Sequence, residues 1–260
     1  MRSFSVGEHV LPIVKSHRKK SIGFKPNAHC FELHVPGHLS DRALKKVLNN
    51  HSDWIQKRLQ AFQTQQEQQA TVFQFKINQP LMLLGDALAF VPTPSQTLKR
   101  ISVSQQNKQL MVTLPDTLWP TTDAHAEEDM QANLSFGQQL APHLSQPLSH
   151  WYKEQAVTYF EQKMPFYAQQ IGVEYTAIQV KGYKSRWGSC YPDGRIQFNW
   201  KLIQAPSWVV DYVMVHELCH LKQANHSAAF WNLVQTHYPQ TPQAKKWLKA
   251  HQYVLMAFLS

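Results

Sequence analysis

The sequence predicts an α+β fold, with a β-rich N-terminal lobe and a helical C-terminal core. Short runs of apolar and β-branched residues, separated by turn residues, recur between residues 1 and 115. From residue 148 onward, apolar positions recur instead at the spacing of helix faces. A chain of 260 residues, 43% of them apolar, is long enough to bury a sizeable core. We therefore expect a globular protein rather than a disordered chain.

The N-terminal lobe, residues 1–115, is expected to combine several strands with one helix. Ser40 is a suitable N-cap, and the apolar residues between Leu44 and Leu59 follow it at helical spacing. This helix should end in the glutamine-rich stretch 63–69. Strands are expected at 10–14, 21–25, 30–35, 71–77, 81–84, 87–91, 101–104 and 110–114.

A polar segment follows the lobe. Residues 116–147 contain a cluster of acids between 123 and 129 and several Gln, Pro and Ser residues, which is typical of a surface insertion or linker. The C-terminal core, residues 148–260, should begin with a long helix that ends near residue 171 and is interrupted or kinked near Pro165. A last helix should pack across the C-terminal face.

A turn signal lies within this core. Pro192, Asp193 and Gly194 follow one another, and proline presets φ while glycine accepts a positive φ. The segments on either side of this turn, from Lys181 to Trp200, should therefore pair as a β-hairpin.

The motif His216-Glu217-Leu218-Cys219-His220 indicates metal-assisted hydrolysis. On a helix, residues four apart share a face, so His216 and His220 can point toward one ion. Glu217 beside them is placed to take a proton from a metal-activated water and deliver it to a leaving group. The apolar run 208–215 before the motif predicts a buried helix that begins near Pro206 and Ser207.

A catalytic zinc ion needs a third protein ligand and an open position for water. After Glu217 the chain contains no Asp or Glu, which leaves His226, His237 and His251 as the downstream candidates. His226 is favoured if the chain turns at Asn225 and a second helix begins after Ser227 as its N-cap. The alternative interpretation, stronger for His237 and His251, is that the histidines are ordinary surface or core residues.

Four further residues are candidate substrate contacts. The edge of the predicted hairpin would lie beside the metal helix and pair with an extended peptide, with Arg186 and Trp187 lining the cleft. The alternative for Trp187 is simple packing in the sheet. Tyr212, Tyr238 and Arg186 are candidate donors to the oxyanion of a tetrahedral intermediate.

The chain resembles the YgjP-like metallopeptidases. The resemblance rests on Arg186-Trp187-Gly188-Ser189-Cys190, on Asn199-Trp200-Lys201-Leu202-Ile203, on Asp211-Tyr212-Val213 leading into the motif, and on Asn225-His226-Ser227 and Phe230-Trp231. It implies a compact zincin-like peptidase in which His216, His220 and His226 bind Zn²⁺ and Glu217 is the catalytic base. The same arrangement is distantly similar to that of the SprT-like proteases, which act on proteins crosslinked to DNA.

Charge and composition set the expectations for partners and location. The net charge is +9, and residues 1–60 carry 11 Lys/Arg against 4 Asp/Glu. This basic lobe would attract nucleic acid, so the competing hypotheses are a nucleic-acid-associated protein with a structural metal, and a hydrolase of non-peptide amides or esters. Three cysteines without paired spacing, no signal-peptide pattern and no membrane-length apolar run favour a cytoplasmic protein. The peptidase interpretation implies a protein or peptide substrate.

Overall fold

The structure is a computed structural model that describes residues 3–6, 9–17, 23–26, 31–57, 59, 80–119 and 130–259. The chain divides into two compact units, Met1–Ala70 and Thr71–Ser260. This division differs from the expected lobe over 1–115, because the strands between residues 81 and 115 belong to the second unit. The expected strand at 71–77, the glutamine-rich stretch and the acidic cluster at 123–129 lie outside the described residues.

The first unit is a four-stranded sheet with a helix. Its strands are β1 (Ser3–Val6), β2 (His9–Ser16), β3 (Gly23–Pro26) and β4 (Phe31–Pro36), in the order β1-β2-β4-β3 with β2 and β4 parallel. Helix α1 (Asp41–Asn50) begins after Ser40, whose side chain accepts a hydrogen bond from the backbone N–H of Ala43. Leu33 and Val35 of β4 are buried together with Leu44 and Leu48 of α1.

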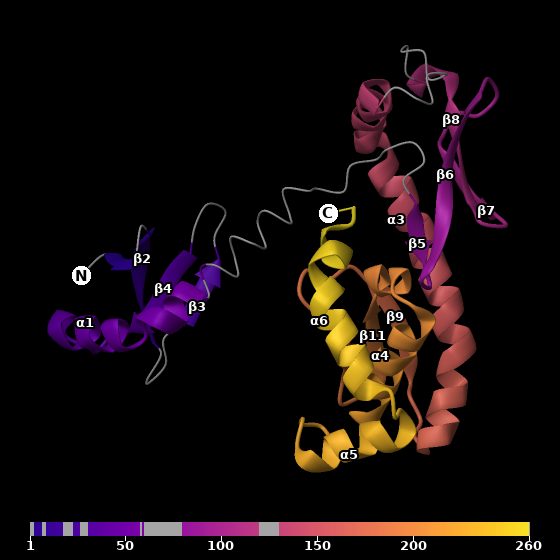
Figure 1. Cartoon of the computed structure of the whole chain (residues 1–260). Coiled ribbons are helices and arrows are strands. Elements are labelled where there is room, and N and C mark those ends of the chain that lie inside the picture. Colours follow the sequence, from indigo (N-terminus) through magenta and orange to yellow (C-terminus); the bar gives the residue numbers. More distant parts are fainter. Residues whose placement is uncertain are drawn as a thin grey trace. The chain divides into compact units, whose positions relative to one another are not determined.

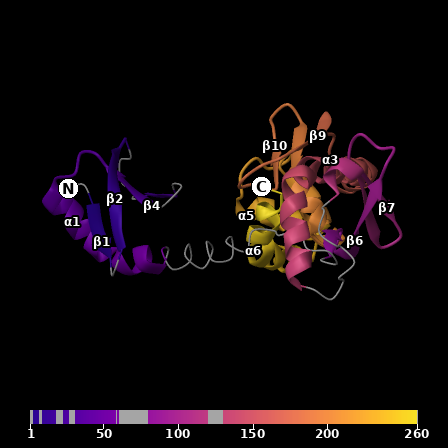
Figure 2. The same cartoon turned by 90° about the horizontal axis from the view of Figure 1, so that it is seen from above.

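The second unit contains two sheets and one long helix (Figure 1). The first sheet has the order β5-β6-β8-β7 and consists of β5 (Leu81–Leu83), β6 (Asp86–Ser95), β7 (Ser102–Gln106) and β8 (Gln109–Pro115). The second has the order β10-β11-β9 and consists of β9 (Ala177–Lys181), β10 (Gly188–Cys190) and β11 (Arg195–Asn199). Helix α3 (Met130–Ile171) contacts both sheets. Figure 2 shows α3 from above, beside β6 and β9.

Helix α3 begins 18 residues earlier than expected, so residues 130–147 are helical rather than an insertion or linker, and the helix continues through Pro165. Pro142 and Pro147 also lie inside it. Buried residues recur every four positions along this part of the helix, at Phe136, Leu140, Leu144 and Leu148. Burial of this apolar stripe offsets the hydrogen bonds that the prolines remove.

Helix α4 (Ser207–Cys219), which carries the motif, is fixed at its start by the turn between β5 and β6. Leu84 and Gly85 both have positive φ, at 51° and 87°, as a two-residue type I′ hairpin turn requires. The N–H of Leu84 donates to the carbonyl of Ile203 at 2.7 Å, and the carbonyl of Leu84 accepts from the N–H of Ser207 at 3.3 Å. Leu84 therefore satisfies an N–H that has no partner within α4.

Contacts with α3 hold the middle of α4. The hydroxyls of Tyr159 and Tyr167 donate to the two carboxylate oxygens of Asp211, at 2.7 and 2.9 Å. On the neighbouring sheet, Phe160 of α3 stacks on Phe198 of β11 with ring centroids 4.3 Å apart. Helix α4 is thus anchored to α3, which in turn packs on the second sheet.

The chain continues with α5 (Ala228–His237) and α6 (Thr241–Ala257). As expected, Ser227 is the N-cap of α5, and its side chain accepts from the N–H of Phe230 at 3.3 Å. The 3₁₀ segment η2 (Trp200–Gln204) connects β11 with α4. Among the described residues, no helix is both long enough and apolar enough to cross a membrane. The α+β class predicted from the sequence is confirmed.

Candidate active site

Three imidazoles meet at the end of α4. The ligand atoms of His216, His220 and His226 all lie within 4.8 Å of one another. His216 and His220 are one turn apart, and His220 keeps helical backbone angles although α4 ends at Cys219. The chain then turns before α5, as the sequence predicted, and brings His226 back to them.

The geometry of this cluster fits a divalent metal ion with nitrogen ligands. The Nε2 atoms of His216 and His226 are 3.1 Å apart. Two histidine ligands of a tetrahedral zinc ion, each with a Zn–N bond of about 2.0–2.1 Å, place their nitrogens about 3.3 Å apart. The Nδ1 of His220 lies 3.1 Å from the carbonyl oxygen of Gln223, which leaves Nε2 of His220 for the ion.

Aromatic rings enclose the imidazoles. Phe230 stacks on His220, with ring centroids 4.4 Å apart and an interplanar angle of 23°. Trp231 stacks on His226, at 5.5 Å and 20°. His226 is itself exposed, on a loop whose neighbours are also exposed. Contact with the two rings of α5 is therefore what orients the third imidazole.

Burial keeps His216 and His220 neutral. Burial, with smaller contributions from the neighbouring His220 and His226, lowers the pKa of His216 to about 3. Burial also lowers the pKa of His220. Because only a neutral imidazole has a lone pair for a metal, His216 and His220 can bind an ion without first releasing protons.

Glu217 is a buried carboxyl group beside the cluster. It is 5% exposed and lies against the α-carbon of Gly188 in β10. Burial raises the pKa of Glu217 to about 8, and the guanidinium of Arg186 acts in the opposite direction. A carboxyl group whose pKa lies close to neutral pH is suited to accept and return a proton.

Strand β10 presents a free backbone edge beside Glu217. It is the edge strand of its sheet, and it pairs with β11 through the carbonyl of Trp187 and the N–H of Tyr191. Since hydrogen-bonded positions alternate along an antiparallel pair, the N–H and C=O of Gly188 and Cys190 point away from β11. The hairpin and its turn were predicted correctly, with Gly194 at a φ of 83°.

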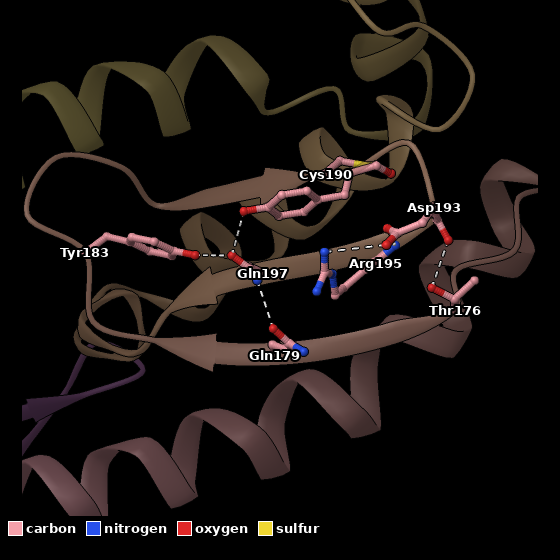
Figure 3. Close-up of polar contacts among 8 residues, drawn as sticks. Thr176, Gln179, Tyr183, Cys190, Asp193, Arg195 and Gln197 are labelled. Carbon is pink, nitrogen blue, oxygen red and sulfur yellow. Dashed lines mark hydrogen bonds and ion pairs between the residues drawn. The ribbon is translucent and has the colours of Figure 1, made fainter.

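A polar network on the second sheet shapes the loop before β10 (Figure 3). The side-chain oxygen of Gln197 accepts from the hydroxyls of Tyr183 and Tyr191, and its NH₂ group donates to Gln179. Nδ2 of Asn199 donates to the backbone carbonyls of Tyr183 and Arg186, at 2.9 and 3.0 Å. These bonds fix the conformation of residues 183–187.

The four candidate substrate contacts lie in different surroundings. Arg186 is exposed and close enough to Glu217 to act on its pKa, while Trp187 is half-buried against the core. The ring of Tyr212 lies 6.0 Å from that of His216. The hydroxyl of Tyr238 instead donates to the carbonyl of Trp208 at 2.5 Å, eight residues and about 12 Å along α4 from His216.

Three contacts of the site were not predicted. Gly188 and Trp231 belong to the segments that carry the family resemblance, but nothing in a single sequence places them against Glu217 and His226. Lys245 of α6, whose Nζ lies 3.7 Å from the centroid of the Trp231 ring, gave no signal at all.

Comparisons with known proteins define first a class and then a family. The chain is a metal-dependent peptidase, because the model of the YgjP-like metallopeptidase domain matches residues 20–251. The protein therefore belongs to the YgjP-like family, and membership implies a divalent metal ion and a protein or peptide substrate.

A solved structure, the metallopeptidase zymogen of Pyrococcus abyssi abylysin, is 19% identical, with a TM-score of 0.33, and the match covers 35% of this chain and 94% of that one. No curated protein matches the chain.

Proposed function

We propose that this protein is a zinc-dependent peptidase in which His216, His220 and His226 hold the ion and Glu217 is the general base. The observation that carries the proposal is the convergence of three imidazoles beside one buried carboxyl group. Three nitrogen donors with no carboxylate among them favour zinc over magnesium or calcium, which prefer oxygen ligands. The family supports the reaction class.

A bound zinc ion would polarise the scissile carbonyl and lower the pKa of water at the site. Glu217 takes up the proton that this water loses and returns it to the amine of the leaving group. Its burial makes both steps favourable, because the raised pKa of Glu217 lies between those of an ordinary carboxyl group and an amine. The burial of Glu217 also strengthens its interaction with any charge that develops beside it.

The substrate would bind as an additional strand on β10. The free N–H and C=O groups of Gly188 and Cys190 can pair with an extended peptide, as in β-augmentation. Such pairing recognises backbone and places a peptide bond near Glu217, which packs on Gly188. Tyr212 is the favoured oxyanion donor, since its ring lies against His216 and its hydroxyl has no hydrogen bond to a described residue.

The test combines metal content with cleavage. Glu217→Gln should keep one zinc per chain, measured by atomic emission, and lose cleavage of an unfolded protein substrate by about 10³-fold or more. His226→Ala should lose both zinc and cleavage. Glu161→Gln, an exposed position on α3, is the matched control and should change neither. Full cleavage by Glu217→Gln would refute the assigned base.

A further inference from the structure

We propose that the site selects acidic peptide segments, with Arg186 and Lys245 binding carboxylate side chains of the substrate. This rests on the proposed function and adds a substrate class to it. The two cations come from different elements, the loop before β10 and helix α6.

Both cations border the metal centre. The Nζ of Lys245 lies over the ring of Trp231, which stacks on His226. Arg186 lies two residues before Gly188, against which Glu217 packs. Arg186 also directly precedes Trp187 and Gly188, so it stands at the start of the strand edge proposed to pair with substrate. A peptide bound along β10 passes within reach of these charges.

Among the described residues, no carboxylate forms an ion pair with Arg186 or Lys245, and each cation lies over an aromatic ring instead. The Nζ of Lys245 lies 3.7 Å from the ring centroid of Trp231, and the Cζ of Arg186 lies 5.2 Å from that of Tyr183. A cation–π contact orients a cation without neutralising it. Arg195 differs, since it lies over Tyr191 but also forms an ion pair with Asp193 at 3.4 Å. Arg186 and Lys245 therefore keep their charge available for a ligand.

The segment that carries the site is rich in cations and poor in acids. Residues 175–260 contain nine Lys/Arg and only three Asp/Glu. Asp211 accepts from two tyrosines, Asp193 is paired with Arg195, and Glu217 is the buried base. Two of the cations, Lys201 and Lys222, are engaged with the backbone carbonyls of Met256 and Ile171. The remaining charge complements an acidic ligand.

A peptide fits this surface better than a polynucleotide. The outward N–H and C=O groups of Gly188 and Cys190 alternate as donors and acceptors, which matches the backbone of an extended peptide. Phosphodiester chains offer acceptors but no such alternating donors. The charges and the strand edge together therefore point to an acidic segment of protein.

Binding to the zinc-loaded Glu217→Gln variant tests the selectivity without cleavage. Two fluorescein-labelled dodecapeptides, identical except that four Glu are replaced by Gln, are compared by anisotropy at low ionic strength. The Glu peptide should bind about tenfold more tightly, and the difference should shrink at 0.5 M NaCl because salt screens exposed charges. Equal affinities for the two peptides would overturn the proposal.

Variants locate the effect. Arg186→Gln and Lys245→Gln should each reduce the ratio of the two affinities by about threefold to fivefold. Lys246→Gln removes the same charge from the next exposed position of α6 and should leave the ratio within twofold. The double variant Arg186→Glu with Lys245→Glu should prefer a matching Lys peptide. An unchanged preference in that variant would contradict the assignment of these two residues.

Two more measurements separate the proposals. If the wild-type protein cleaves neither peptide although the affinities differ as expected, the proposed peptidase function fails and the acidic selectivity stands. If a dT oligonucleotide displaces the Glu peptide and binds more tightly than it does, the surface serves nucleic acid and the acidic-peptide proposal fails.

Discussion

Gly188 of β10 lies so close to Glu217 that any side chain at position 188 would collide with the side chain of Glu217. A Cβ at position 188 would lie 2.6 Å from Oε1, 2.7 Å from Cγ and 2.8 Å from Cδ of Glu217. These separations are far shorter than the 3.5–4.0 Å at which non-bonded atoms attract one another. The position of Glu217, the proposed base, therefore depends on the absence of a side chain at position 188.

Gly188→Ala should consequently impair catalysis without removing the metal. Because the added methyl group pushes the carboxyl group aside, kcat should fall by about 100-fold, while zinc content stays at one per chain. Ser189→Ala, on the same strand, deletes a buried hydroxyl that forms no hydrogen bond to a described residue, and it serves as the control.

A compensating change sharpens this prediction. Glu217→Asp shortens the acid by one methylene and makes room for the methyl group. Adding Gly188→Ala to Glu217→Asp should therefore cost far less than adding it to the wild-type protein. Equal costs in the two backgrounds would show that the glycine acts elsewhere.

Trp231→Leu should weaken zinc binding about tenfold, because the ring that orients the exposed His226 is lost. Competition with a chromophoric chelator measures the affinity. Trp247→Leu is the matched control, since Trp247 forms a similar stack with His251 at 4.0 Å on α6. The account is wrong if both variants bind zinc as the wild-type protein does.

The stability of the metal-free protein should fall as the pH rises from about 6.5 to 8. The folded state raises the pKa of Glu217 to about 8, so it holds a proton that the unfolded chain has released. Stability is then lost at about 1.4 kcal/mol per pH unit, or about 2 kcal/mol across this interval. His216 affects stability only below about pH 6.5. There the unfolded chain binds a proton that the folded His216, with its lowered pKa, does not bind, so stability falls as the pH falls.

Urea unfolding at the two pH values measures this loss. Glu217→Gln carries no titrating group at this position, so its stability should be nearly the same at pH 6.5 and 8. A wild-type protein whose stability does not change over this interval would contradict the burial of an ionisable Glu217.

Two tyrosines should respond differently to removal of their hydroxyls. Tyr238→Phe loses a hydrogen bond to the carbonyl of Trp208, so it should cost about 1 kcal/mol of stability and leave kcat within twofold. Tyr212→Phe should lower kcat about 100-fold if Tyr212 is the oxyanion donor. Thermal unfolding and steady-state kinetics measure the two effects. A large loss of kcat in Tyr238→Phe, with only a stability loss in Tyr212→Phe, would contradict this assignment.

The sequence predicted the elements of the site that rest on local signals. The four-residue spacing of His216 and His220, the N-cap at Ser227 and the turn at Gly194 each depend on a few neighbouring residues, and each is found as expected. The convergence of His226 with the other two follows from the same local turn. The three strands expected between residues 10 and 35 are present where the chain is described.

The parts that the sequence did not predict depend on tertiary contacts or on conflicting signals. Pro142 and Pro147 argued against a helix before residue 148, yet the stripe from Phe136 to Leu148 was a helical signal that outweighed them. Strand β9 has only five residues and pairs in parallel with β11, a tertiary contact that its own short sequence does not indicate. The roles of Gly188 and Lys245 exist only once β10 and α6 lie against α4 and α5.

The most direct test of the central claim is an anomalous difference map, recorded at the zinc edge, of crystals of the zinc-loaded protein. The account predicts one peak between the Nε2 atoms of His216, His220 and His226, with an open position on the side of Glu217. A peak bound by other side chains, or one that lies away from Glu217, would contradict it.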